Sequence, residues 1–137
     1  MSEGKPTFGA SIVSSDVDAS VAFYRTLGVP IPDEANWRSH HVGIPIDGTA
    51  LDLDSVDLTK SYDSKWNGTG IILIMRVPTR EAVDETYERV VDAGHPSQLA
   101  PFDAFWGARY AVVRDPDGNP VGIMSPSDES LGGAPPI

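Results

Sequence analysis

The sequence predicts an α+β domain made of two copies of a βαβββ unit. Each half begins with a β-prone segment, continues with a capped helix and a glycine stop, and reaches a hairpin built around an Asp-Gly turn. The hairpin segment 47–53 aligns without a gap with 117–123, and the preceding segment 40–42 aligns with 110–112. The shared order and turn chemistry favour an internal repeat over chance similarity.

The first unit is expected over residues 7–56. Phe8–Val13 is β-prone, and Asp16 is placed to cap a helix that runs to about residue 27, where Gly28 suits a left-handed stop. Trp37–Ile46 and Ala50–Asp54 are strand-like and joined by a turn. Residues 57–70 show little periodicity, so we expect a connection without regular structure.

The second unit is expected over residues 71–126. Ile71–Met75 is apolar throughout, as in a strand buried on both faces. Thr79 opens a helix that ends at Gly94, and Gln98–Pro101 is a candidate edge strand. The hairpin within Phe105–Pro126 closes the unit. Residues 127–137 are expected to form a mobile tail.

The amino-acid composition limits the kinds of molecule that the protein is expected to bind. The 137 residues suffice for one domain, and the absence of cysteine excludes disulfides, thiol nucleophiles and zinc–thiolate sites. A net charge of −10 disfavours nucleic acid and anionic membranes. The first residues lack the apolar core of a signal peptide, and no apolar run is long enough to span a membrane. We expect a soluble cytoplasmic protein whose partner is a small molecule or another protein.

The string Asp115-Pro116-Asp117-Gly118 before a short strand resembles the closing hairpin of the vicinal oxygen chelate superfamily. That superfamily contains glyoxalase I, extradiol dioxygenases and bleomycin-resistance proteins. The resemblance extends from about residue 8 to residue 126. It implies two βαβββ units whose mixed sheets curve around a cleft, with the helices outside, and it implies that metal-dependent members place their ligands in this cleft.

The ligand positions that the resemblance implies fall on Gly9, Asp52, Ile72 and Gly122. Only Asp52 can bind a metal through its side chain, whereas a divalent ion normally needs at least two or three protein ligands. We therefore expect no metal and no other cofactor. Gly122, without a side chain, is expected to leave room for a ligand.

Histidines are the remaining candidates for metal binding or proton transfer. His40 and His41 are adjacent, so on a strand they point to opposite faces and cannot share one ion without a bulge. One of them enters the cleft, or both only form hydrogen bonds at the sheet edge. His95 follows a helix stop, where it is more suited to capping the helix.

Aromatic residues outside the helices are the main candidates for ligand contact, because aromatic faces with a few polar partners suit a flat ligand. Phe105 and Trp106 could instead only close one end of the sheet, and the aspartates could lie on a solvent-facing edge. The predicted ligand-binding set is Trp37, His40, His41, Asp52, Asp54, Trp66, Phe102, Phe105, Trp106, Tyr110, Gly122 and Met124.

The preferred function is metal-free sequestration of a small hydrophobic or aromatic molecule, such as an antibiotic, as the resemblance to the bleomycin-resistance branch implies. The alternative is a lyase, isomerase or dioxygenase of the glyoxalase type, with His41 and Asp52 as candidate acid–base residues. An interaction module without a ligand is a third possibility. The sheets of such units leave unpaired edges that a second copy of the chain can cover, so we expect a homodimer. No nucleophile motif stands out, so the catalytic residues are left unassigned.

Overall fold

The computed structural model describes residues 5–135 and 137, and this part of the chain contains three α-helices and eight strands. The predicted α+β class is confirmed. The chain divides into two compact units. The N-terminal unit comprises residues 10–71, and the C-terminal unit comprises residues 72–135 together with residues 5–9. No helix in these ranges is long and apolar enough to cross a bilayer.

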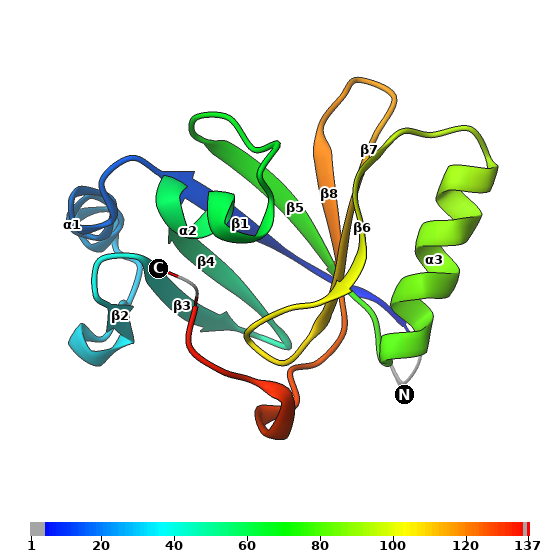
Figure 1. Cartoon of the computed structure of the whole chain (residues 1–137). Helices are drawn as coiled ribbons and strands as arrows, with labels where there is room; N and C mark the ends of the chain where they lie inside the picture. The colour runs from blue at the N-terminus through cyan, green and yellow to red at the C-terminus, as the bar shows by residue number, and fades with distance from the viewer. Residues whose placement is uncertain (1–4, 136) are drawn as a thin grey trace. The chain divides into compact units, whose positions relative to one another are not determined.

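The N-terminal unit packs a helix against one face of four strands (Figure 1). The strand order is β2-β3-β4-β1, with β1 parallel to β4 and the other pairs antiparallel. Its elements are β1 (Thr7–Ser14, entering the unit at Ala10), α1 (Val17–Leu27), a 3-10 turn (Asp33–Ala35), β2 (Asn36–Trp37), β3 (His41–Ile46), β4 (Thr49–Ser55) and α2 (Val56–Tyr62).

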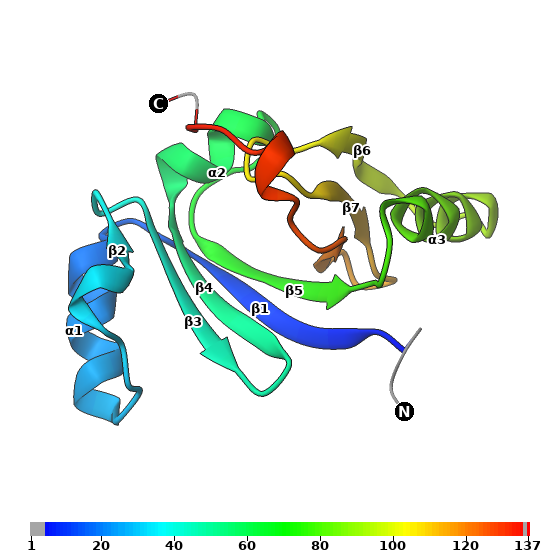
Figure 2. The ribbon, with the colours of Figure 1, turned by 90° about the horizontal axis from the view of Figure 1, so that it is seen from below.

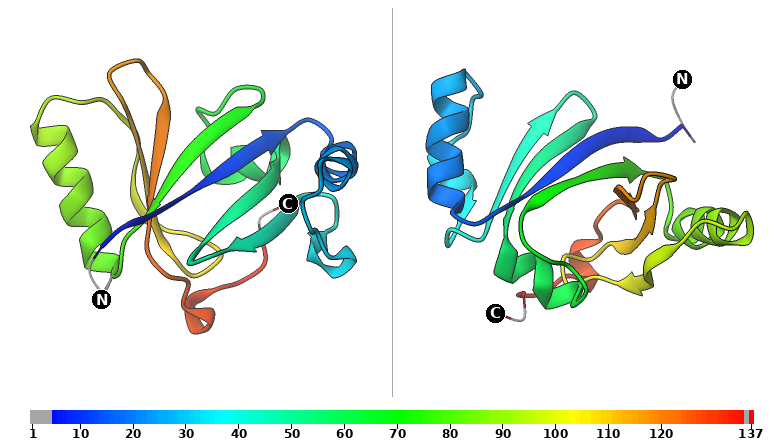
Figure 3. Two further views of the ribbon diagram at one scale, coloured as in Figure 1. Left: turned by 180° about the vertical axis from the view of Figure 1, so that it is seen from behind. Right: turned by 90° about the horizontal axis from the view of Figure 1, so that it is seen from above.

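Helix α1, seen from two further directions in Figure 3, begins and ends where the sequence predicts. The Asp16 carboxylate accepts a hydrogen bond from the amide of Ala19 at 3.0 Å, and Gly28 ends the helix in the left-handed conformation at φ 110°. The core of this unit consists of Val17, Val21, Ile31, Val42, Ile44 and Leu53. The strand residues that alternate with this core therefore face away from α1.

The C-terminal unit repeats this plan (Figure 2). The strand order is β5-β8-β7-β6, with β5 parallel to β8. Its elements are β5 (Gly70–Arg76, entering the unit at Ile72), α3 (Arg80–Asp92), β6 (Ser97–Asp103), β7 (Arg109–Arg114), β8 (Pro120–Met124) and a 3-10 turn (Glu129–Leu131). The core against α3 consists of Val77, Val83, Ala111, Val113 and Ile123.

The predicted repeat extends to the register of the parallel strands. In the N-terminal unit Ser11 pairs with Asp52, and in the C-terminal unit Ile74 pairs with Gly122. Ser11 lies five residues before the cap Asp16, and Ile74 lies five residues before the cap Thr79. The two βαβββ units therefore match in strand order, helix position and register.

Three segments differ from the prediction in the N-terminal unit and on β5. The connection contains helix α2, which Ser55 caps by accepting a hydrogen bond from the amide of Leu58 at 3.0 Å. Positive φ angles at Arg38 and Ser39 divide the predicted strand 37–46 into β2 and β3. Strand β5 is buried on one face only, because the side chains between its buried positions are solvent-exposed.

Part of the predicted mobile tail, residues 128–133, packs on the rest of the C-terminal unit. Beyond β8 the chain forms the 3-10 turn Glu129–Leu131, and the amide of Asp128 donates to the carbonyl of Gly107 at 3.0 Å. Figure 2 shows this red segment beside the loop that joins β6 to β7. Hydrogen bonds to that loop, which residue types alone do not reveal, hold the segment in place.

Candidate functional site

A polar cluster lies on the face of the N-terminal unit that points away from α1. It consists of Ser11, His41, Asp52 and Asp54, contributed by the three adjacent strands β1, β3 and β4. Strand register brings these residues together, because Ser11 and Gly43 both pair with Asp52, and His41 pairs with Asp54. Predicted residues 41, 52 and 54 therefore share one face.

The buried carboxylate of Asp54 organises this polar cluster. Its Oδ2 accepts a hydrogen bond from Ser11 Oγ at 3.0 Å, and its Oδ1 lies 2.6 Å from His41 Nδ1. An ionised carboxylate can only accept hydrogen bonds, so Nδ1 carries a proton and donates a hydrogen bond to Asp54. The second ring nitrogen, Nε2, is therefore the atom of His41 that gains or loses a proton.

His41 Nε2 lies beside Gly43, whose missing side chain opens a notch. A Cβ at Gly43 would lie 3.4 Å from Nε2 and 3.5 Å from Asp52 Oδ1. A nitrogen base and a carboxylate oxygen therefore border the same small opening, an arrangement suited to an O–H or N–H group of a ligand.

Electrostatics favour the charged form of His41. Burial works against the imidazolium, but the hydrogen bond that His41 donates to Asp54 and the charges of Asp54 and Asp52 outweigh it and raise the pKa of His41 above its usual value. The cluster thus binds a proton more tightly than an isolated imidazole does.

The pKa shift of His41 predicts a pH-dependent stability. Because the folded pKa is raised above 6.5, His41 adds stability that is complete below that value and is lost as pH rises through the folded pKa. We expect the free energy of unfolding lost in His41→Gln to be larger at about pH 5.5 than at about pH 9. Denaturant titrations at both pH values measure this difference. In an Asp54→Asn background the pH dependence should shrink, and an equal loss at both pH values would contradict the prediction.

Two members of this site were missed by sequence reasoning. Ser11 lies in the predicted first strand, where no sequence pattern marks it as a site residue, and Tyr62 lies on helix α2, which was not predicted. Burial, followed by the charge of Asp54, raises the pKa of the Tyr62 phenol well above its usual value, which places that phenol near the cluster. Ser55, a residue type favoured at helix N-caps, was the signal that could have revealed α2.

The other candidates in this unit have separate roles. His40 Nδ1 lies 2.7 Å from Ser55 Oγ, so His40 supports the cap of α2 and does not join His41. Trp37 pairs with His41 and shares its face, with the Arg38 guanidinium 5.0 Å from the ring centre. Trp66 is buried within its own loop, where its Nε1 donates to the carbonyl of Gly68 at 2.8 Å.

The C-terminal unit carries an aromatic cluster on the face that points away from α3. Phe102 pairs with Tyr110 across β6 and β7, and their ring centres are 6.1 Å apart. Trp106 contacts Tyr110 edge to face at 5.5 Å and Phe105 at 4.9 Å. The members of the aromatic cluster are Phe102, Phe105, Trp106 and Tyr110.

Trp106 is also fixed by a polar contact, because its Nε1 donates to Met124 Sδ at 3.3 Å. Tyr110 is 2% exposed and forms the base of the cluster, whereas Phe102, Phe105 and Trp106 are half-buried. The predicted residues of the second half are therefore brought together by β6, β7, β8 and one loop. Phe102, Phe105 and Trp106 are each partly accessible to solvent.

The space at Gly122 is filled by the protein itself. A Cβ at Gly122 would lie 2.7 Å from Tyr110 Oη and 2.8 Å from both Tyr110 Cε1 and Ile74 Cδ1. The expectation that this glycine leaves room for a ligand is therefore wrong. The Tyr110 ring and the Ile74 side chain occupy the position instead.

The residues present do not fit the metal site implied by the family resemblance. The residues opposite Asp52 and Gly122 across the parallel pairs are Ser11 and Ile74, and not Gly9 and Ile72, the other two ligand positions that the resemblance implies. Tyr110 occupies the space that a ligand side chain at Gly122 would need. No three His, Asp or Glu side chains within the described ranges are arranged to hold a metal ion.

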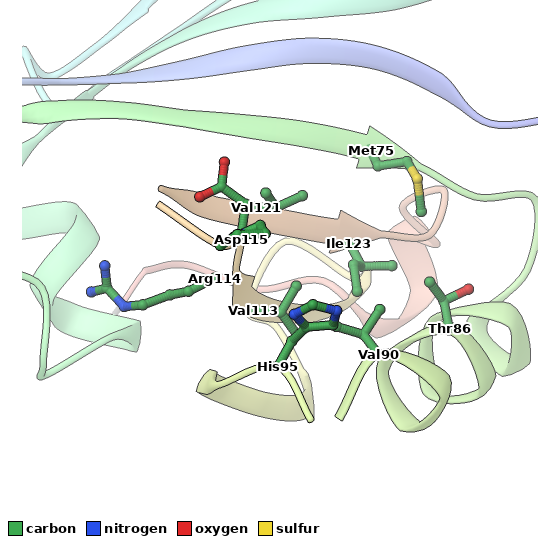
Figure 4. Close-up of a pocket in the computed structure, with 10 residues that line it drawn as sticks. Met75, Thr86, Val90, His95, Val113, Arg114, Asp115, Val121 and Ile123 are labelled. Atoms are coloured by element: carbon green, nitrogen blue, oxygen red, sulfur yellow. The ribbon is translucent and has the colours of Figure 1, made fainter. Parts of the chain in front are cut away.

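A hollow of about 240 Å³ lies on the opposite, α3 side of the C-terminal unit (Figure 4). Figure 4 shows His95 and Val90 beside Val113 and Ile123 at its wall. The amide of His95 donates to the carbonyl of Val90 at 3.3 Å, so this residue stays close to the end of α3. The hollow is an extension of the apolar core. Its lining residues are Met75, Thr86, Val90, His95, Val113, Arg114, Asp115, Pro116, Val121 and Ile123.

Two βαβββ units with matching register, each with a helix on one face and candidate ligand-contacting residues on the other, define the class of paired-βαβββ proteins. The chain belongs to the Glyoxalase/Bleomycin resistance protein/Dioxygenase superfamily, whose family model matches residues 9–123. No curated protein matches the chain.

Solved structures share this fold at low sequence identity. A Legionella pneumophila protein described as an NAD-dependent benzaldehyde dehydrogenase superposes with a TM-score of 0.66 at 20% identity, over 87% of this chain and 98% of that one. A superfamily member from Vibrio splendidus gives a TM-score of 0.58 at 14% identity, over 89% and 100% of the two chains. The Mn(II)-bound glyoxalase of Novosphingobium aromaticivorans gives 0.56 at 19% identity, over 95% and 40%.

Proposed function

We propose that the protein binds a small, flat hydrophobic molecule at the aromatic cluster, without a resident metal, and releases it chemically unchanged. The observation that carries this proposal is the set of three half-buried rings, Phe102, Phe105 and Trp106, above the buried Tyr110. Aromatic rings provide a large contact area at low cost in conformational entropy. An antibiotic of the planar aromatic type is the ligand class that such a surface suits.

Charge narrows the ligand class further. The chain carries a net charge of −10, which concentrates cations near its surface and repels anions. We therefore expect flat aromatic compounds that carry an amine to bind more tightly than anionic compounds of the same size. Superfamily membership supports the proposal, because bleomycin resistance proteins are among the members by which this superfamily is described.

Calorimetric titration with a panel of planar aromatic antibiotics, headed by the amine-bearing polyketide doxorubicin, tests the proposal. We expect saturable binding by at least one compound, without turnover, and the same affinity after dialysis against a chelator. The absence of binding across the panel would overturn the proposal. Multiple turnovers of a bound compound would show that the protein is an enzyme.

A second candidate function rests on the polar cluster. Asp54 orients His41 so that Nε2 faces the Gly43 notch, which is the arrangement of an imidazole general base held by a carboxylate. Metal-independent proton transfer on a small substrate is the activity it would support. If turnover is found, His41→Gln should abolish it and Trp66→Phe should not.

We also propose that the protein is a homodimer. Strand β5 exposes two large apolar side chains on one face, with Ile71 at 62% and Leu73 at 44% exposure, and Phe8 on β1 is 53% exposed. Exposed apolar side chains of this size favour association. Sedimentation at high micromolar concentration should give twice the chain mass of 14.7 kDa, and Leu73→Lys should shift the protein towards monomer. A wild-type protein that stays at the monomer mass would contradict this prediction.

A further inference from the structure

The loop between β6 and β7, residues 104–108, carries Phe105 and Trp106 and is held by hydrogen bonds from two other parts of its unit, α3 and the segment 128–133. Within the loop the amide of Ala104 donates to Ala108 at 2.8 Å and that of Gly107 donates to Ala104 at 3.0 Å. Arg80, from the first turn of α3, donates to the carbonyl of Gly107 at 3.1 Å and pairs with Asp103. Helix α3 thus anchors the loop.

The chain segment 128–133 also anchors the loop, at two of its carbonyl groups. The amide of Asp128 donates to the carbonyl of Gly107 at 3.0 Å, and the amide of Gly133 donates to the carbonyl of Phe105 at 2.6 Å. Gly132 is packed so that a Cβ there would lie 3.5 Å from the backbone of Trp106. The two ends of this segment therefore hold the backbone on either side of the tryptophan.

The fit between loop and segment is close at Gly107. This residue has a φ of 91°, and a Cβ on it would overlap the carbonyl oxygen of Asp128, a backbone atom that cannot move alone. The segment keeps its own shape because the Asp128 carboxylate accepts hydrogen bonds from the amide of Ser130 at 3.0 Å and from its hydroxyl at 2.6 Å. The contact therefore depends on a glycine on one side and a capped turn on the other.

We propose that residues 128–133 form a positioning strap that fixes Trp106 in the orientation needed for ligand contact. The strap holds the loop backbone, and the indole then reaches Met124 and Tyr110. Its role in affinity rests on the proposed binding function, whereas its role in holding Trp106 does not. Asp128 and Gly107 are positioning residues, since neither residue belongs to the aromatic cluster.

The test compares Gly107→Ala with Gly118→Ala in the full-length chain. Gly118 also has a positive φ, 86°, but no atom lies within 4 Å of its Cβ position, so it controls for backbone strain alone. In ligand-free protein we expect Gly107→Ala to speed amide exchange at Asp128 and Gly133 by about tenfold or more. The ¹⁵N indole signal of Trp106, assigned by its loss in Trp106→Phe, should move in Gly107→Ala and stay in Gly118→Ala. An unmoved indole signal in Gly107→Ala would overturn the strap.

Asp128→Ala is the second variant, in case Gly107→Ala does not fold. It removes the cap of the turn without adding atoms, and Asp128→Asn keeps an acceptor oxygen and should restore the wild-type indole signal. We expect Asp128→Ala to weaken doxorubicin binding by about tenfold. A shifted indole with unchanged affinity would overturn the role in binding. If the wild type binds no compound of the panel, the proposed function fails. The amide-exchange rates and the indole signal of Trp106 still test whether the strap holds the loop.

Discussion

Replacing Trp106 with alanine should weaken ligand binding by about 2 kcal/mol or more, roughly thirtyfold in Kd. The indole provides the largest ring of the aromatic cluster, and it contacts Phe105, Tyr110 and Met124. Its removal takes away a contact face and also loosens the rings beside it. Calorimetric titration of wild type and variant with the tightest compound of the panel measures the loss.

Phe23→Ala is the matched control for this substitution. Phe23 is an aromatic residue on α1 that is 61% exposed and lies outside the aromatic cluster. We expect its replacement to leave the affinity within about twofold of the wild-type value. If Trp106→Ala binds as tightly as the wild type, Trp106 serves the stability of the loop and the binding surface lies elsewhere.

Gly122→Ala should destabilise the fold by about 1–3 kcal/mol, because the added methyl group overpacks a filled site. It would lie 2.7 Å from the hydroxyl of the buried Tyr110 and 2.8 Å from Ile74 Cδ1. The midpoint of thermal unfolding should fall by about 4 °C for each kcal/mol. Combining the change with Ile74→Val, which removes Cδ1, should recover part of the loss.

Gly43→Ala serves as the comparison, since Gly43 also lies in a strand of a unit's sheet. Its Cβ would make ordinary contacts at 3.4 and 3.5 Å, and its φ is not positive. We expect a stability within about 1 kcal/mol of wild type, because the lost freedom of the unfolded glycine offsets small strain. Equal losses in the two variants would show that Gly122 is not specially confined.

Elements with strong local signals could be predicted from the sequence. Asp16 and Thr79 cap their helices through side-chain oxygens, and the Asp-Gly turns at 47–48 and 117–118 place glycine at positive φ. These features depend on residues close in sequence, so residue types suffice to find them. Helix α2 was missed because its seven residues are too few to give a clear apolar period.

The candidate site was predicted in part, for reasons of register. Period-two alternation places Asp52 and Asp54 on one face, and this holds in the structure. The residue that completes the polar cluster, Ser11, comes from a parallel strand more than 40 positions away, and only the pairing of β1 with β4 selects it. The space at Gly122 on β8 is filled by Tyr110 from β7 and Ile74 from β5, so it depends on three strands and has no local sequence signal.

The shared register of the two units separates the backbone pairing from the choice of side chains. Ser11 opposite Asp52 and Ile74 opposite Gly122 occupy the same places in two copies of one module. A chain with two such copies has two equivalent positions at which chemistry can be gained or given up, while the backbone pairing stays the same. Here one copy carries carboxylates and an imidazole, and the other carries a cluster of aromatic rings. The same backbone pairing therefore supports two different sets of side chains within one chain.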